Sequence, residues 1–252
     1  MLLPDRLAGL WRNVEASHLS REDFVQEQER LLGLYRLEWE RALLCNGETD
    51  LRTSLLHEVA CYYGISDITK TEYRCDLAVD TLKREWKTKV DLGEHFSIEL
   101  FYESPTHIYD LINWHSLKDD NDPLAYVLAL NIARSVNVQR CLDFGSGVGS
   151  GALLFCFNDI HMTLADISTN LLDFARWRIT QRGLVARFLD LKKSSLADAK
   201  FDMILAMDVF EHLENPVEAV SSLWRAMRHG GLLFARIHAE MDSNHPQCSI
   251  SV

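Results

Sequence analysis

The chain has 252 residues, 47% of them hydrophobic and 25% charged, which is enough apolar material for one large core or two smaller ones. Its net charge of −11 repels a phosphate backbone, and no basic patch is large enough to reverse that field, so nucleic acid is not expected as a partner. No run of about 18 apolar residues predicts a membrane span and the start lacks a secretory signal, so we expect a cytoplasmic protein without membrane contact.

The first third of the chain carries apolar residues at helical intervals. Leu31 and Trp39 belong to one such series, and a second series follows after residue 50. Gly47 and Gly64 come directly after these series and indicate helix ends. The sequence therefore predicts a helical region up to about residue 90.

An aromatic segment follows, between residues 95 and 121. It contains His107, Tyr109, Trp114 and His115. These side chains either form a lid over a bound substrate or pack between the helical part and the rest of the chain. We expect residues 1–121 to form one helical region that shapes a substrate pocket or its lid.

From Val138 onward, short apolar runs alternate with helical stretches, the pattern of parallel strands joined by crossover helices. The expected strands are 138–144, 161–165, 185–189, 201–207 and 232–237. The expected helices between them are 150–157, 168–182 and 216–228, the last ending at His229-Gly230-Gly231. Residues 122–252 are thus predicted to be an α/β domain with a doubly wound, mostly parallel sheet.

The residues just after each strand are the ones to examine, because ligands bind such sheets beyond the carboxyl ends of the strands. The first strand leads into Asp143-Phe144-Gly145-Ser146-Gly147-Val148-Gly149, whose glycines permit positive φ and a close approach of backbone amides to a ligand. The second ends at Asp166 and the third at Asp190. The fourth opens into Met207-Asp208.

The glycine loop alone does not choose a cofactor, because dinucleotide-binding proteins use a similar turn in the same place. A nicotinamide or flavin cofactor therefore stays possible. Asp143, two residues before the first glycine, favours a ligand with a cationic amino or sulfonium group and would repel a pyrophosphate.

Two segments together resemble the class I S-adenosylmethionine (SAM)-dependent methyltransferases, which have a Rossmann-like sheet. Residues 142–149 resemble the first motif of that family, and residues 201–213 resemble its fourth-strand motif in the small-molecule branch. The resemblance implies that SAM is the cofactor, with Asp166 on the ribose hydroxyls and Asp190 on the adenine amine. The cofactor-binding residues it implies are Asp143, Gly145, Ser146, Gly147, Asp166, Ile167, Asp190, Leu191, Met207 and Asp208.

Some of these acids have a second interpretation. Asp166 precedes Ser168 and a predicted helix, where an aspartate is also typical of an N-cap. Asp190 is also compatible with a solvated loop.

Two histidines are candidates for the base that removes a proton from a methyl acceptor. His212 is expected to open the helix that follows the fourth strand, and His238 follows the fifth strand. No metal is predicted, because His238 and the nearby His245 do not make a coordination sphere. The six cysteines lie at wide intervals without a C-x-x-C pair, which indicates reduced thiols.

The leading hypothesis is a methyltransferase that acts on a small molecule, with the acceptor and its reacting atom left open. The alternatives are a catalytically silent SAM-binding or interaction protein and, third, an NAD-dependent oxidoreductase. The family's sheet normally continues beyond the fifth strand, yet the polar stretch after Ile237 cannot supply further strands. We therefore expect a fragment, a shortened variant or an uncovered fifth strand, and self-association through that exposed edge.

Overall fold

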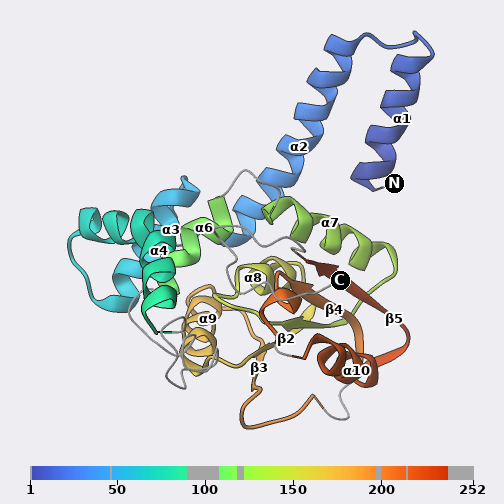
Figure 1. Cartoon of the computed structure of the whole chain (residues 1–252). Coiled ribbons are helices and arrows are strands. Elements are labelled where there is room, and N and C mark those ends of the chain that lie inside the picture. The colour runs from blue at the N-terminus through green and yellow to red at the C-terminus, as the bar shows by residue number, and fades with distance from the viewer. Residues whose placement is uncertain are drawn as a thin grey trace.

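The computed structural model describes residues 2–45, 47–89, 108–117, 122–196, 200–213 and 215–237 (Figure 1). Its N-terminal part contains α1 (Leu3–Glu15), α2 (Arg21–Leu43), α3 (Leu51–Tyr63), α4 (Ile68–Lys89), η1 (Ile108–Leu111), α6 (Ile112–Leu117) and α7 (Asp122–Ser135). None of the helices in these ranges combines the length and apolar character needed to cross a bilayer.

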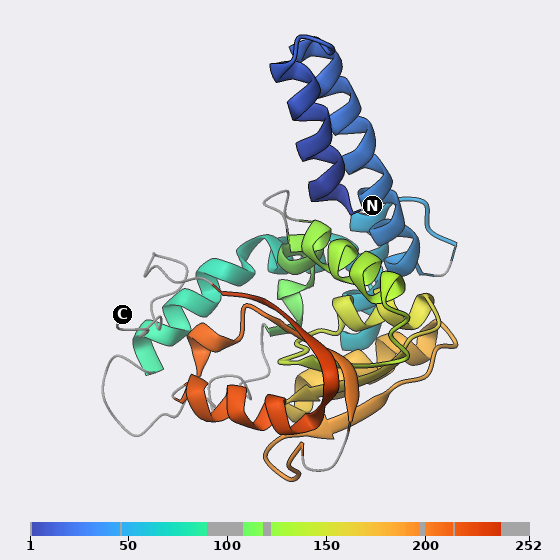
Figure 2. The ribbon, with the colours of Figure 1, turned by 90° about the vertical axis from the view of Figure 1, so that its right-hand side faces the viewer.

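A helical hairpin made of α1 and the first part of α2 projects from the body of the molecule (Figures 1 and 2). Ser20 begins α2, because its side chain accepts a hydrogen bond from the backbone N–H of Asp23. Trp11 on α1 packs edge-on against Phe24 on α2, with ring centroids 5.3 Å apart. The second half of α2 enters the body, where Trp39 and Leu43 are buried.

The ends of α3 follow from two residues. The Asp50 carboxylate accepts a 2.7 Å hydrogen bond from the Thr53 backbone at its start, and Gly64 closes it in the left-handed conformation with φ of 69°. Gly64 therefore ends a helix, as predicted. Gly47 does not, because α2 already ends at Leu43 and Gly47 lies in the following turn with φ of 80°.

The C-terminal part is a five-stranded sheet with crossover helices. Its strands are β1 (Arg140–Phe144), β2 (His161–Asp166), β3 (Arg187–Asp190), β4 (Phe201–Met207) and β5 (Met227–Arg236). Its helices are α8 (Ser150–Phe157), α9 (Thr169–Gln181), η2 (Phe210–His212) and α10 (Pro216–Ala226). The strand order is β3-β2-β1-β4-β5 and every adjacent pair is parallel, which confirms the predicted fold class.

Helices cover both faces of this sheet because the strand order runs from the centre toward one edge for β1 to β3 and toward the other edge for β4 and β5. The right-handed crossovers from β1 to β2 to β3 and from β4 to β5 place their helices on opposite faces. Alternate side chains of the central strands point to opposite faces of the sheet, so they pack in two separate hydrophobic cores. Cys141 and Leu205 pack on the face of α8 and α9, whereas Leu142 and Ile204 pack on the face that α10 covers.

The start of β5 differs from the sequence prediction. Helix α10 ends at Ala226 and not at His229-Gly230-Gly231, and the backbone of Met227 already pairs with Phe201. The pairing then shifts, since the next partners are Met203 and Leu232, and Gly230 has φ of 75°. Strand pairing with β4 thus overrides the glycine signal, and the glycines form an irregularity within β5. In the part of the chain that the structure describes, β5 is an edge strand.

Candidate functional site

The glycine loop between β1 and α8 lies at the point where the strand order reverses, between β1 and β4. Gly145, Gly147 and Gly149 have φ of 69°, 51° and 77°. A Cβ on Gly145 would lie 2.5 Å from the Val209 side chain, and one on Gly149 would lie 2.8 Å from the Ala175 Cβ. A Cβ on Gly147 would meet no atom within 4 Å. Gly147 therefore borders the space where a ligand can approach the backbone.

Asp166, at the end of β2, fixes the shape of this loop. One carboxylate oxygen accepts a 2.9 Å hydrogen bond from the Gly147 N–H, and the other accepts one of 2.9 Å from the Ser168 N–H. Helix α9 is capped by Ser168, whose hydroxyl accepts from the Leu171 backbone. Asp166 thus orients the cap residue, but it is not itself the N-cap. Burial raises the pKa of Asp166.

Asp143, at the carboxyl end of β1, is 1% exposed. Burial, followed by repulsion from Asp166, raises the pKa of Asp143 to about 7, while a backbone hydrogen bond at Ala152 acts in the opposite direction. Its Oδ2 atom has no hydrogen-bond partner among the described residues, and neither has the buried hydroxyl of Ser146 in the loop. A buried carboxylate oxygen of this kind suits a cationic ligand group.

The carboxylate of Asp190 lies beside Asp166, because these two residues pair in the register of β2 and β3. Asp190 accepts hydrogen bonds from the Thr169 hydroxyl (2.9 Å) and the Lys192 backbone (3.0 Å), and it pairs with Lys193 at 2.7 Å. The hydrogen bond from Lys193 is the main cause that lowers the pKa of Asp190.

The hydrophobic neighbours of these acids, Ile167 and Leu191, are half-buried. The Leu191 backbone N–H donates to the Asp166 carbonyl at 2.9 Å, which holds the loops after β2 and β3 together. The residues predicted to bind ribose and adenine therefore lie together at the carboxyl ends of β2 and β3.

Met207 and Asp208 end β4, on the other side of the glycine loop. Met207 is buried, and Asp208 adopts a positive φ of 54°, which is uncommon outside glycine but which aspartate adopts more readily than most residues. Arg236 on β5 donates from Nε to Asp208 Oδ1 at 2.7 Å and from a second nitrogen to Oδ2. The Asp208 carboxylate is therefore bound bidentately by an arginine that the sequence did not indicate as part of the site.

Of the two candidate bases, His212 and His238, the structure describes only His212. His212 is half-buried in η2 and does not open a helix, because α10 begins at Pro216 after its N-cap Asn215. That detail of the prediction is wrong, since the Asn215-Pro216 pair is the stronger start signal. His238 lies outside the described residues, as do His245 and His107.

In the aromatic segment, Tyr109 is 6% exposed and packs against Tyr62 and Phe174, with ring centroids 5.2 Å and 4.8 Å away. Tyr109 is therefore a core residue between the helical part and α9. A separate pocket of about 230 Å³ lies among α2, α3, α6 and α7, and its walls include Trp39 and Ser116 but no strand-end residue.

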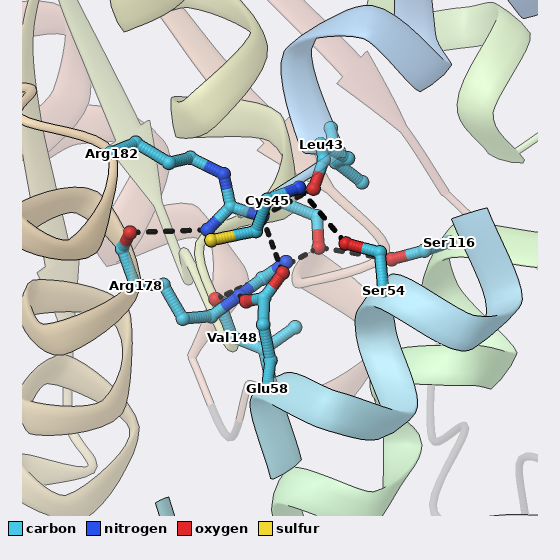
Figure 3. Close-up of polar contacts among 9 residues, drawn as sticks. Leu43, Cys45, Ser54, Glu58, Ser116, Val148, Arg178 and Arg182 are labelled. Atoms are coloured by element: carbon cyan, nitrogen blue, oxygen red, sulfur yellow. Dashed lines mark hydrogen bonds and ion pairs between the residues drawn. The ribbon is translucent and has the colours of Figure 1, made fainter. Parts of the chain in front are cut away.

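Sequence reasoning missed a buried ionic cluster behind the glycine loop. Glu58, Arg178 and Arg182 form it (Figure 3). A signal was present, because Arg178 falls on the same helical face as Phe174 and Ala175, and a charged residue on an apolar face indicates a buried ion pair. Its partner could not be found this way, since Glu58 is 120 positions away.

The fold and its strand-end loop define a Rossmann-like domain with its glycine loop at the topological switch point, the place where sheets of this kind bind ligands. Residues 142–235 match a protein family described as a methyltransferase domain. Residues 142–235 are therefore similar to a methyltransferase domain, in agreement with the sequence resemblance to the class I SAM-dependent methyltransferases.

Individual relatives are similar only over part of their length. A demethylmenaquinone methyltransferase of Bacteroides fragilis is 25% identical over 54% of this chain and 58% of its own length. A ubiquinone biosynthesis O-methyltransferase of Histophilus somni is 26% identical over 40% of this chain and 46% of its own length. A solved SAM-dependent methyltransferase from Clostridium acetobutylicum is 18% identical, with 50% of this chain and 53% of that chain covered and a TM-score of 0.41. The chain thus spans about half the length of these curated relatives.

Proposed function

We propose that this chain binds SAM at the carboxyl ends of β1 to β4 and transfers its methyl group to a small molecule. The observation that carries the proposal is Asp143, a buried carboxyl group with one oxygen lacking a described hydrogen-bond partner, at the base of a loop with three positive-φ glycines. Such a group fits the amino group of SAM, whereas a pyrophosphate would be repelled.

Each predicted cofactor residue receives a role. Gly145, Ser146 and Gly147 would accommodate the methionine part, and Met207 and Asp208 would line the floor beneath it. Asp166 with Ile167 would bind the ribose, and Asp190 with Leu191 the adenine. The register that places Asp166 beside Asp190 supports this division, because ribose and adenine are neighbouring parts of one ligand.

Bound SAM would supply an electrophilic methyl group, which the acceptor attacks as the bond from carbon to sulfur breaks and its electron pair goes to sulfur. The protein has to align the acceptor with that methyl group and exclude water. We assign removal of the acceptor's proton first to His212, just beyond β4, and second to His238.

Two features favour a small acceptor. The net charge of −11 disfavours nucleic acid. Two relatives carry names of small-molecule enzymes, a demethylmenaquinone methyltransferase and a ubiquinone biosynthesis O-methyltransferase. We also propose that residues 1–121 shape the acceptor pocket and that residues 122–252 bind the cofactor.

Calorimetric titration with SAM, S-adenosylhomocysteine (SAH) and NAD tests the proposal. We expect SAM and SAH to bind and NAD not to bind. Asp143→Asn should weaken SAH binding at least about tenfold, since a charge-assisted contact is lost. The matched control is Asp173→Asn on α9, where an exposed aspartate pairs with Arg176. NAD binding without SAM binding would refute the proposed cofactor.

Turnover is tested separately, by measuring SAH release from SAM in the presence of a panel of small hydroxyl- and amine-bearing molecules. We expect acceptor-dependent release. SAM binding without release across acceptors of all these classes would indicate a silent SAM-binding protein instead.

A further inference from the structure

Arg178 on α9 lies directly behind the glycine loop and is fully buried (Figure 3). Its Nε donates to Glu58 Oε2 at 2.6 Å. One terminal nitrogen donates both to the Val148 carbonyl at 2.7 Å and to the Ser150 hydroxyl at 2.9 Å. Arg178 thus holds the last part of the loop and the first residue of α8, while its other contact reaches α3.

Glu58 provides the charge that keeps Arg178 in this position. It is 3% exposed and also pairs with Arg182, which in turn donates to the Leu43 carbonyl. Burial lowers the pKa of Arg178, and the Glu58 carboxylate acts against that shift. Because a buried charge is costly unless it is paired, the buried arginine depends on the Glu58 carboxylate beside it.

A second branch joins the same arginine to other N-terminal helices. The hydroxyls of Ser150 and Ser116 share a hydrogen bond of 3.0 Å, and the Trp39 indole N–H donates to the Ser116 carbonyl at 3.0 Å. Glu58 of α3 and Ser116 of α6 therefore reach Arg178 and Ser150 directly, and Trp39 of α2 holds the Ser116 backbone.

The glycine loop is consequently held from both sides. On the β2 side, Asp166 accepts from the Gly147 N–H. On the α9 side, Arg178 donates to the carbonyl of Val148, the residue after Gly147. The Ser146–Gly147 and Val148–Gly149 peptide groups are thus fixed by two different charged side chains, and only the second depends on the N-terminal helices.

We propose that Arg178 is a positioning residue for the cofactor loop and that Glu58 is the contact through which the N-terminal helices set its affinity for SAM. This inference rests on the proposed function of the loop. A change in the N-terminal helices that moves Glu58 then alters cofactor binding without touching the cofactor. The coupling is reciprocal, so bound cofactor stabilises α3.

The test is Glu58→Gln, which keeps the shape of the side chain and removes its charge. We expect SAH to bind about tenfold or more weakly to this variant, measured by calorimetry at a temperature where its circular dichroism shows it folded. Glu58→Asp should restore part of the affinity, because it restores the charge. The matched control is Glu72→Gln, which removes the charge from an exposed partner of Arg52 on the neighbouring helix and should leave SAH affinity unchanged.

A folded Glu58→Gln protein with wild-type SAH affinity would overturn the inference, even if its melting temperature had fallen. If the variant does not fold, amide hydrogen exchange on the wild type decides. Bound SAH should then slow exchange in α3 as well as in the loop, whereas protection confined to the loop and strand ends would overturn the coupling. Failure of the wild type to bind SAM or SAH would instead refute the proposed function.

Discussion

The carboxyl groups of Asp143 and Asp166 lie at the ends of two adjacent strands, and burial together with their mutual repulsion raises the pKa of Asp143 to about 7. In the unfolded chain the same carboxyl titrates near its ordinary pKa of 3.8. Between these two values the folded protein holds a proton that the unfolded chain has lost. The unfolding free energy contributed by Asp143 therefore decreases as the pH rises through this interval.

Asp143→Asn makes this effect measurable, because asparagine imitates the protonated acid. The variant should equal the wild type in stability near about pH 4 and exceed it by a few kcal/mol, roughly up to 4, near about pH 8. Urea unfolding followed by circular dichroism at several pH values measures the difference. A difference that does not change with pH would show that Asp143 titrates normally.

The raised pKa of Asp143 also predicts how cofactor binding depends on pH. If the ammonium group of SAH pairs with ionised Asp143, then binding below about pH 7 requires loss of a proton. The affinity for SAH should then fall by up to about tenfold per unit as the pH decreases below that value, over a range where the ligand's amino group stays charged.

Asp143→Asn is the control for this pH profile. Its SAH affinity should be weak and nearly independent of pH, because no carboxyl group remains to ionise at that position. Calorimetry in buffers of different ionisation enthalpy counts the protons that the wild type and the variant each release when SAH binds. A wild-type affinity that stays constant from about pH 5.5 to 7.5 would contradict pairing with Asp143.

The strand-end acids could be predicted from sequence because strand and helix periods alternate regularly after Val138. Once the strands are placed, the parallel topology brings Asp143, Asp166 and Asp190 together at the carboxyl ends of the strands. What could not be predicted depends on contacts between distant segments. Glu58 and Arg178 meet only because α3 packs near α9, and Arg236 reaches Asp208 only because β5 pairs with β4.

Local signals also failed where tertiary pairing opposed them. Gly230 and Gly231 have the composition of a helix end, but the strand begins earlier because Met227 pairs with Phe201. The projection of α1 and α2 had no signature in the apolar periodicity, which is similar in packed and projecting helices.

Gly147 offers a test that separates backbone strain from loss of ligand space. Gly147→Ala and Gly183→Ala both place a Cβ at positive φ, at 51° and 65°, and neither Cβ meets an atom within 4 Å. Both variants should therefore lose a similar amount of stability, about 1–2 kcal/mol. Only Gly147→Ala should also weaken SAH binding, by about tenfold or more, because its methyl group enters the proposed ligand space. Equal SAH affinity in the two variants would place the ligand elsewhere.

The exposed edge of β5 is the reason to predict self-association of the chain. This strand pairs with β4 on one side only within the described residues, and its Leu233 is 40% exposed. Unpaired backbone groups beside exposed apolar side chains favour pairing with a second chain, and a lysine on the edge strand opposes it. The wild type should show a mass that rises with concentration in light scattering, and Leu233→Lys should remain monomeric. Phe157→Lys at the end of α8, where the side chain is 51% exposed, is the control and should associate like the wild type. A wild type that stays monomeric at all concentrations would show that this edge does not pair.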